Sequence, residues 1–189
     1  MNVAAVLLLA ATTVVGAVLW YVADRRQTAL TTQAAALGGL IPALLVAAAG
    51  LAAQVADRPD DALLTVGTAL ALLAAVSGGG LVATAVLRLA DHAPTRIKPG
   101  DGTDPARSSV SDPSTLRGGA WIGGLERTAV VVTLLAGWPE GLAVVFAVKG
   151  LGRYPELRRP AAAERFIVGT FASVLWAVAL AGVAIALRT

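Results

Sequence analysis

The chain has 189 residues, of which 57% are hydrophobic and only 14% are charged, and its mean hydropathy is +0.74. Soluble domains carry about 25% charged residues, so this composition excludes most soluble enzymes and indicates an all-α membrane protein. There is no cysteine and a single histidine, His92, which excludes disulfides, thiolate chemistry and a multi-histidine site within one chain. We therefore expect no metal site and no cofactor.

Three apolar runs in the first half of the chain are long enough to cross a bilayer, for which about 20 residues suffice. They cover about residues 3–23, 34–56 and 62–89. The first run has no positively charged leader and no small-residue cleavage site, so we interpret it as a retained helix rather than a signal peptide. The third run is longer than a span requires, and the three glycines at 78–80 predict a kink there.

A polar segment, residues 91–118, separates these runs from the second half of the chain. It contains four prolines and many Asp, Ser, Thr and Gly residues, and we predict a flexible cytoplasmic loop. Three further runs follow at about 120–138, 139–157 and 166–187, the fifth being interrupted by Lys149 and Arg153. The sequence therefore predicts six transmembrane helices, arranged as three (1–90), a loop (91–118) and three more (119–189).

The distribution of basic residues predicts the orientation, because Lys and Arg are enriched on the cytoplasmic side of short loops. With both termini outside, twelve of the fifteen Lys and Arg residues lie inside, Arg58 and Arg188 lie outside, and Arg127 lies within a helix. Arginine outnumbers lysine 13 to 2, which we interpret as a bacterial composition. We expect a multi-pass protein of the bacterial cytoplasmic membrane, whose basic loops face lipids and not nucleic acid.

Ionisable residues inside spanning segments cost ~2.5–3.5 kcal/mol each at the bilayer centre, and they commonly mark functional sites. Six of them fall in or beside the last three runs, where we expect them to converge in the cytoplasmic half of the membrane. They are Glu126, Arg127, Lys149, Arg153, Glu164 and Arg165. Four positive charges against two negative ones favour an anionic ligand.

Small residues in the same region predict close helix packing. Gly119 and Gly123 form a G-x-x-x-G step, and Gly169 belongs to a four-residue repeat that continues through Ser173 to residues 177 and 181. Small side chains let helix backbones approach each other in lipid. We therefore expect the packing core in the fourth, fifth and sixth helices.

This half of the chain contains three motifs: I-G-x-L-E-R at 122–127, K-x-x-x-R at 149–153 and E-x-x-x-x-G-T-x-x-S at 164–173. With them, residues 118–180 resemble a set of uncharacterised bacterial integral membrane proteins that contain a domain of unknown function. The resemblance implies no established activity. It adds Thr170 and Ser173 to the candidate site as hydrogen-bond donors.

These residues support more than one interpretation. The preferred hypothesis is binding or transport of a small anionic solute or lipid headgroup at a cytoplasmic-side site, with Glu126 and Glu164 orienting the basic residues. Alternatively, Glu126 pairs with Lys149 or Arg153, and Glu164 with Arg127, only to hold helices together in a subunit of a homo-oligomer or membrane complex. A proton or ion pathway through Glu126 is a third hypothesis. A lipid-modifying enzyme is the weakest, because no activated nucleophile or histidine base is visible.

Overall fold

The computed structural model describes residues 2–26, 32–55, 59–91, 119–158 and 160–189. Within these ranges every regular element is helical, as predicted, and there are six α-helices and one 3₁₀ turn. They are α1 (Asn2–Arg26), α2 (Thr32–Gln54), α3 (Asp61–Asp91), α4 (Gly119–Leu135), α5 (Gly141–Gly152), η1 (Glu156–Arg158) and α6 (Pro160–Ala186). Residues 92–118, nearly all of the expected loop, lie outside the described residues.

Four of the helices are long and apolar enough to cross a membrane. Their apolar stretches are Val3–Val22 in α1, Ala36–Gln54 in α2, Asp61–Ala90 in α3 and Ala162–Ala186 in α6. In lipid each backbone group must be bonded within its own segment, which is why such runs form helices. With 17 and 12 residues, α4 and α5 are about 25 and 18 Å long, short of the ~30 Å hydrocarbon core. The chain is therefore all-helical in its described residues, and four helices long and apolar enough to cross a bilayer indicate a membrane protein.

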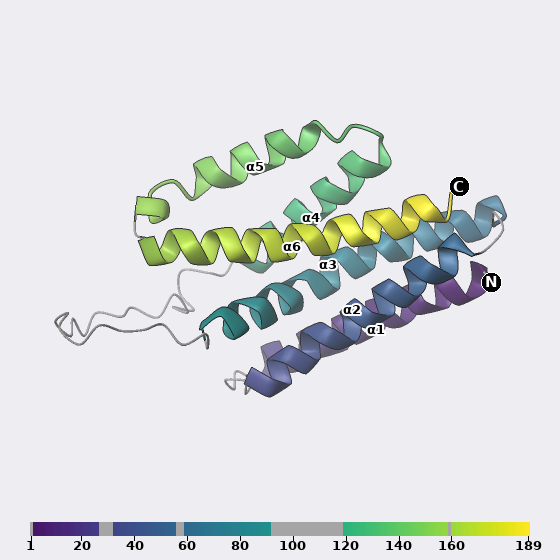
Figure 1. Ribbon diagram of the computed structural model, residues 1–189, viewed down its shortest axis with the longest axis horizontal. Coiled ribbons are helices and arrows are strands. Elements are labelled where there is room, and N and C mark those ends of the chain that lie inside the picture. The colour runs from purple at the N-terminus through teal and green to yellow at the C-terminus, as the bar shows by residue number, and fades with distance from the viewer. Residues whose placement is uncertain (1, 27–31, 56–58, 92–118, 159) are drawn as a thin grey trace.

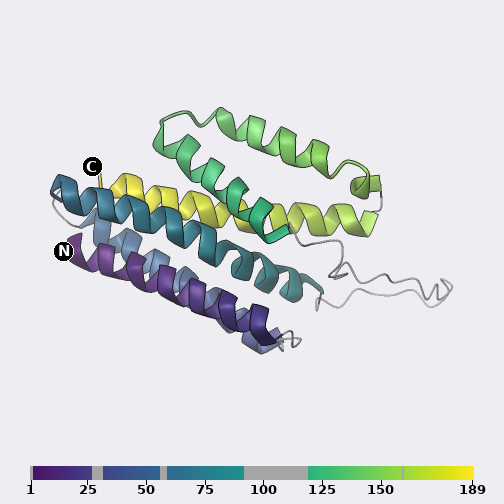
Figure 2. The same cartoon turned by 180° about the vertical axis from the view of Figure 1, so that it is seen from behind.

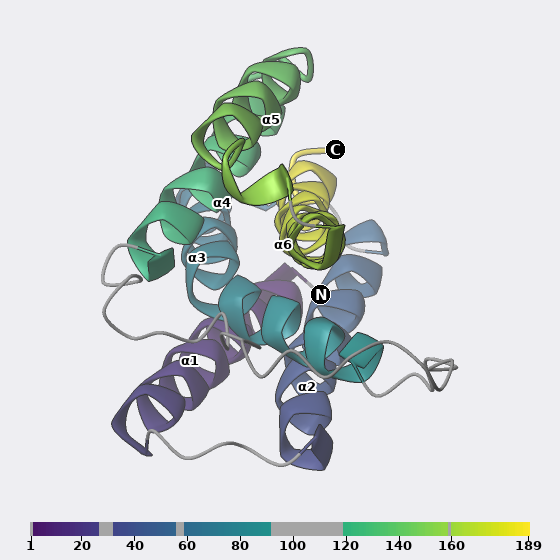
Figure 3. The same cartoon turned by 90° about the vertical axis from the view of Figure 1, so that its left-hand side faces the viewer.

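The four long helices lie side by side, and α4 and α5 form a hairpin against one flank of this bundle (Figures 1 and 2). Helix α3 is central, since it contacts α1, α2, α4 and α6. Helix α4 packs on α3 and α6, whereas α5 packs on α4 and is the outermost helix in the end-on view (Figure 3). Both chain termini lie at one end of the bundle (Figure 1), and the start of α6 lies at the other.

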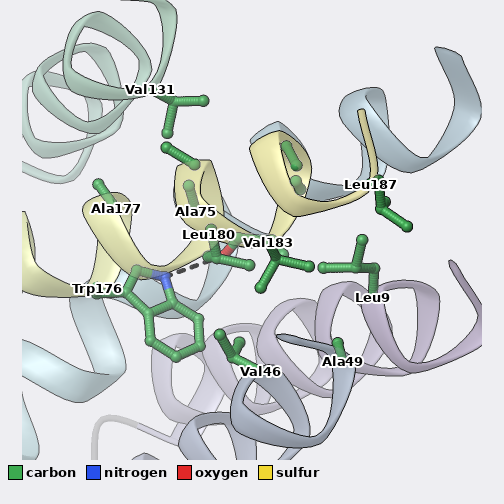
Figure 4. Close-up of a cluster of buried hydrophobic side chains, with 14 of the residues drawn as sticks. Leu9, Val46, Ala49, Ala75, Val131, Trp176, Ala177, Leu180, Val183 and Leu187 are labelled. Atoms are coloured by element: carbon green, nitrogen blue, oxygen red, sulfur yellow. Dashed lines mark hydrogen bonds between the residues drawn. The ribbon is translucent and has the colours of Figure 1, made fainter. Parts of the chain in front are cut away.

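The buried core lies in α1, α2, α3 and α6 with one side of α4, so the expected core of the fourth to sixth helices was wrong. Figure 4 shows Leu9, Val46, Ala75, Val131 and Trp176, one from each of these five helices, meeting there. Alanines on α3 and α6 are fully buried between these larger side chains: Ala71, Ala74, Ala75, Ala177, Ala181 and Ala184. The predicted small-residue repeat of the sixth helix is therefore buried at 173, 177 and 181, but its main partner is α3, not α5.

Two of the three glycines at 78–80, Gly78 and Gly79, serve as a packing surface, and α3 continues through all three without interruption. A Cβ on Gly78 would lie 2.5 Å from Cζ2 of Trp176, and one on Gly79 would lie 2.7 Å from Nε of Arg127. A Cβ on Gly80 would meet nothing within 4 Å. Because Gly78 and Gly79 carry no side chain, Arg127 of α4 and Trp176 of α6 pack directly on the backbone of α3.

Trp176 illustrates this contact. Its indole Nε1 donates to the carbonyl oxygen of Ala74 at 3.2 Å, drawn as a dashed line in Figure 4. A helical carbonyl lies beside the residue four positions later, here Gly78, so the missing side chain leaves this oxygen accessible. The bond gives the buried indole the partner that a Trp N–H requires, and it joins α6 to the middle of α3.

Candidate functional site

The six charged residues that the sequence singles out do not form one cluster, because Glu126 and Arg127 point in different directions. Consecutive residues on an α-helix are rotated by about 100°. Glu126 therefore faces α5, whereas Arg127 faces α3 and α6. The predicted single cluster is therefore absent. Arg127 faces the bundle of long helices, and the Glu126–Lys149 ion pair lies between α4 and α5.

Arg127 is buried between three helices, with only 8% of its surface exposed. Its Nη2 donates to the carbonyl oxygen of Val76 at 2.9 Å, and its Nη1 donates to Oγ of Ser173 at 3.4 Å. Val76 and Ser173 are the midpoints of α3 and α6, so the guanidinium lies halfway along the bundle. No described carboxylate forms an ion pair with it, and its Nε is buried without a hydrogen-bond partner.

Two glycines make room for this guanidinium. Gly79 on α3 lies against the side chain, and a Cβ on Gly123 of α4 would lie 3.2 Å from Nη1. Gly123 was predicted to be a helix-packing residue, and the side chain that lies against it is Arg127 of its own helix. Gly169 faces Leu87 of α3, at 3.4 Å from an added Cβ to Cδ1. Gly119 is the first residue of α4.

Glu126 and Lys149 form an ion pair that connects α4 to α5. This is one of the pairings that the sequence left open. Both side chains are about four-fifths buried, with 20% and 17% exposed. The Lys149 ammonium also lies 5.9 Å from the centroid of the Phe166 ring at the start of α6, within the range of a cation–π contact. Lys149 is therefore the point at which α5 reaches both α4 and α6.

The same pair lies in the wall of a groove between α4 and α5, which we call the α4–α5 groove. Its volume is about 540 Å³, within the range of small-molecule sites. Most of its wall is apolar, formed by Ile122, Leu125, Val144, Val145, Val148 and Trp138. Its charged residues are Glu126, Lys149 and Arg153. These last two residues lie toward the end of α5 that approaches the start of α6 (Figure 1).

The other predicted site residues lie elsewhere. Glu164 and Arg165 are exposed at the start of α6, and they do not line the groove. Arg127 does not pair with Glu164, the second pairing that the sequence suggested, because it is directed into the bundle. Thr170 is half-buried on α6. Ser173 accepts a hydrogen bond from Arg127 instead of donating one, since a guanidinium has no acceptor.

The turn between α4 and α5 determines the shape of the groove. Gly137 has a φ of 71°, a conformation that glycine adopts at helix C-termini without strain. The N–H of Trp138 donates to the carbonyl of Thr133 at 3.0 Å and that of Gly137 to Leu134 at 3.1 Å, which is a Schellman motif. A Cβ on Gly141 would lie 2.7 Å from Cγ2 of Thr133. These two glycines therefore bring α5 back against α4.

Sequence reasoning missed the partners of Arg127 on α3. The signal was present in the three glycines at 78–80, which fit a packing surface as well as a kink. Trp176 was also missed, although a lone tryptophan within an alanine-rich helix predicts a buried contact with a hydrogen-bond partner.

The arrangement suits non-covalent recognition of an amphipathic anion, because apolar walls lead to basic side chains. Within the ranges that the structure describes, no group of three or more His, Asp or Glu residues is placed to hold a metal ion. Comparisons of the chain with protein-family models, with curated proteins and with solved structures returned no match.

Proposed function

We propose that this protein binds a lipid with an anionic headgroup in the α4–α5 groove. One observation carries the proposal. The groove, of about 540 Å³, has an apolar wall and, at one end, two basic side chains, Lys149 and Arg153. An acyl chain fits the apolar wall, and the basic end favours a phosphate or carboxylate.

A second groove serves as an internal comparison. It lies between α2, α3 and α6, has a similar volume of about 580 Å³, and contains no ionisable residue in its wall. Any apolar groove in a membrane protein contacts lipid chains, so an apolar wall alone gives no selectivity. The basic residues distinguish the α4–α5 groove, and they favour one class of headgroup.

The topology we propose has both termini outside and the charged end of the hairpin on the cytoplasmic side of a bacterial membrane. The α4–α5 hairpin adds two crossings to the four full-length spans. This is supported by Arg188, next to the C-terminus, whose Nη1 donates to the carbonyl oxygen of Leu135 at 3.3 Å. The last turn of α4 therefore lies close to the level at which α6 ends. Basic residues on the inner side agree with the positive-inside rule.

Single cysteines test this topology directly, since the chain contains no cysteine. We expect Glu140→Cys, in the exposed α4–α5 turn, to react with a membrane-impermeant maleimide added to intact cells. Asp60→Cys, in the exposed α2–α3 turn, is the positive control, and Arg158→Cys is expected to react only after permeabilisation. Labelling at 60 but not at 140 would show that the hairpin does not cross the membrane.

Thermal stability of the purified protein tests the binding proposal. We expect phosphatidylglycerol to raise the melting temperature, because a ligand that binds only the folded state stabilises it. Phosphatidylcholine, which has the same chains but no net charge, is expected to give a much smaller rise, and glycerol phosphate, which has no chains, almost none. An equal effect of glycerol phosphate would indicate a soluble anion instead of a lipid. Equal effects of the two lipids would contradict a headgroup-selective site.

The second candidate function, a subunit whose intramembrane charges only hold helices together, also has a specific observation in its favour. The Glu126–Lys149 pair connects α4 to α5, and Arg127 connects α4 to α3 and α6. If this is their only role, exchanging Glu126 and Lys149 should preserve stability, and no lipid should stabilise the protein selectively. If the groove is a lipid site, Lys149→Gln should lose the preference for phosphatidylglycerol.

A further inference from the structure

Lys149, a basic residue of the α4–α5 groove, is paired with a carboxylate of the same wall, that of Glu126. Glu126 and Lys149 both line the groove, and their side chains are in direct contact. An anionic headgroup that reaches the Lys149 ammonium must therefore approach the Glu126 carboxylate as well. Two like charges within ~4 Å repel each other, more strongly where the surroundings exclude water. The headgroup and Glu126 consequently oppose each other at one cation.

The rest of α5 is held loosely enough for this opposition to matter. Gly141, the first residue of α5, is the one described residue of this helix that is buried. α5 packs on α4 but makes no comparable contact with the four long helices, and added Cβ atoms on Gly150 and Gly152 would meet nothing within 4 Å. The Glu126–Lys149 pair is thus a main contact near the charged end of the helix.

We propose that Glu126 is an intramolecular competitor of the anionic headgroup for Lys149, so that this carboxylate sets the affinity and selectivity of the groove. The inference rests on the proposed function. In the unliganded protein Glu126 neutralises Lys149 and keeps the charged end of α5 against α4. When the headgroup binds, its oxygens replace the carboxylate at the ammonium, and the α4–α5 contact at this level is exchanged for a contact with the ligand.

The competition predicts opposite effects for the two members of the pair. Glu126→Gln removes the opposing charge and keeps the side-chain shape, so the full-length protein should bind phosphatidylglycerol about three- to tenfold more tightly. Lys149→Gln should weaken binding by about tenfold. The gain from Glu126→Gln should disappear in the double variant with Lys149→Gln, because interacting residues are not additive. Glu164→Gln, the same change at an exposed position outside the groove, should leave the affinity within about twofold.

Equilibrium titration of the detergent-solubilised protein with phosphatidylglycerol and phosphatidylcholine provides these affinities, and circular dichroism confirms the fold of each variant. If Glu126→Gln does not fold, Glu126→Asp keeps the charge but weakens the pair and should bind with intermediate affinity. Selective binding by the wild type, together with unchanged or weaker binding by the Glu126 variants, would overturn the competition and leave the proposed function intact. Binding without preference for phosphatidylglycerol in the wild type would overturn both.

Discussion

Replacing Gly78 by alanine is expected to destabilise the protein by about 1–3 kcal/mol, as overpacking of a well-packed core does. The added methyl group would lie 2.5 Å from Cζ2 and 3.1 Å from Cε2 of Trp176. The indole has little freedom to move, because it is 95% buried and its Nε1 is bonded to the carbonyl of Ala74. The clash must therefore separate α3 from α6 or break this bond. Thermal and denaturant unfolding of the purified variant measure the loss.

Gly80→Ala is the matched control for this prediction. It adds the same methyl group to the same helix two residues away, where a Cβ meets nothing within 4 Å. We expect its stability to equal that of the wild type or to exceed it slightly, since alanine favours a helix over glycine. Equal losses in the two variants would show that these glycines are needed for the flexibility of α3, as a kink requires, and not for its packing on α6.

Arg127→Ala is expected to cost about 2–5 kcal/mol, in the range of other large-to-small changes in a core. The side chain lies against Gly79, and its removal leaves a void at the meeting point of α3, α4 and α6. Arg127→Met should cost less than about 1 kcal/mol. Methionine refills most of this space, and the change removes a buried cation that has no carboxylate partner among the described residues.

The comparison of these two variants separates packing from charge. If the hydrogen bonds from Arg127 to Val76 and Ser173 are the main stabilising contribution, both variants should lose stability to a similar extent. If packing of the aliphatic stem of Arg127 is the main contribution, as we expect, only the alanine variant should lose stability. Unfolding in detergent at two ionic strengths provides a control, because the contribution of a buried group depends little on salt.

Much of the fold could be predicted from the sequence, because apolar runs of sufficient length have one solution in a membrane. All six helices lie where the runs indicate. The two that fall short of a full span, α4 and α5, include the fifth run, which Lys149 and Arg153 interrupt. The packing partners could not be predicted in this way. Helix α4 packs on α3 although residues 92–118 separate the two helices in sequence. The sequence around Arg127 does not indicate that the carbonyl of Val76 accepts its hydrogen bond.

The candidate site was predicted in composition but not in arrangement. The Glu126–Lys149 pair was among the expected pairings. The rotation of α4 about its axis determines which neighbour each charge faces. That rotation follows from the fit of Val130 and Val131 into the core and of Arg127 onto Gly79. The number of charges in the last three helices does not reveal this rotation of α4. All six charged residues were therefore expected in one cluster, whereas Arg127 faces away from the Glu126–Lys149 ion pair.

Photo-crosslinking with a phosphatidylglycerol analogue that carries a diazirine in its acyl chain tests the location of the lipid site most directly. The protein is labelled in mixed bilayers, and the modified peptides are identified by mass spectrometry. We expect labelling to concentrate on the parts of α4 and α5 that line the groove, such as Leu125 and Val148, and to be displaced by excess phosphatidylglycerol but not by phosphatidylcholine. Labelling that is spread evenly over the exposed faces of α1, α2 and α6, or that both lipids displace equally, would contradict a selective site in the α4–α5 groove.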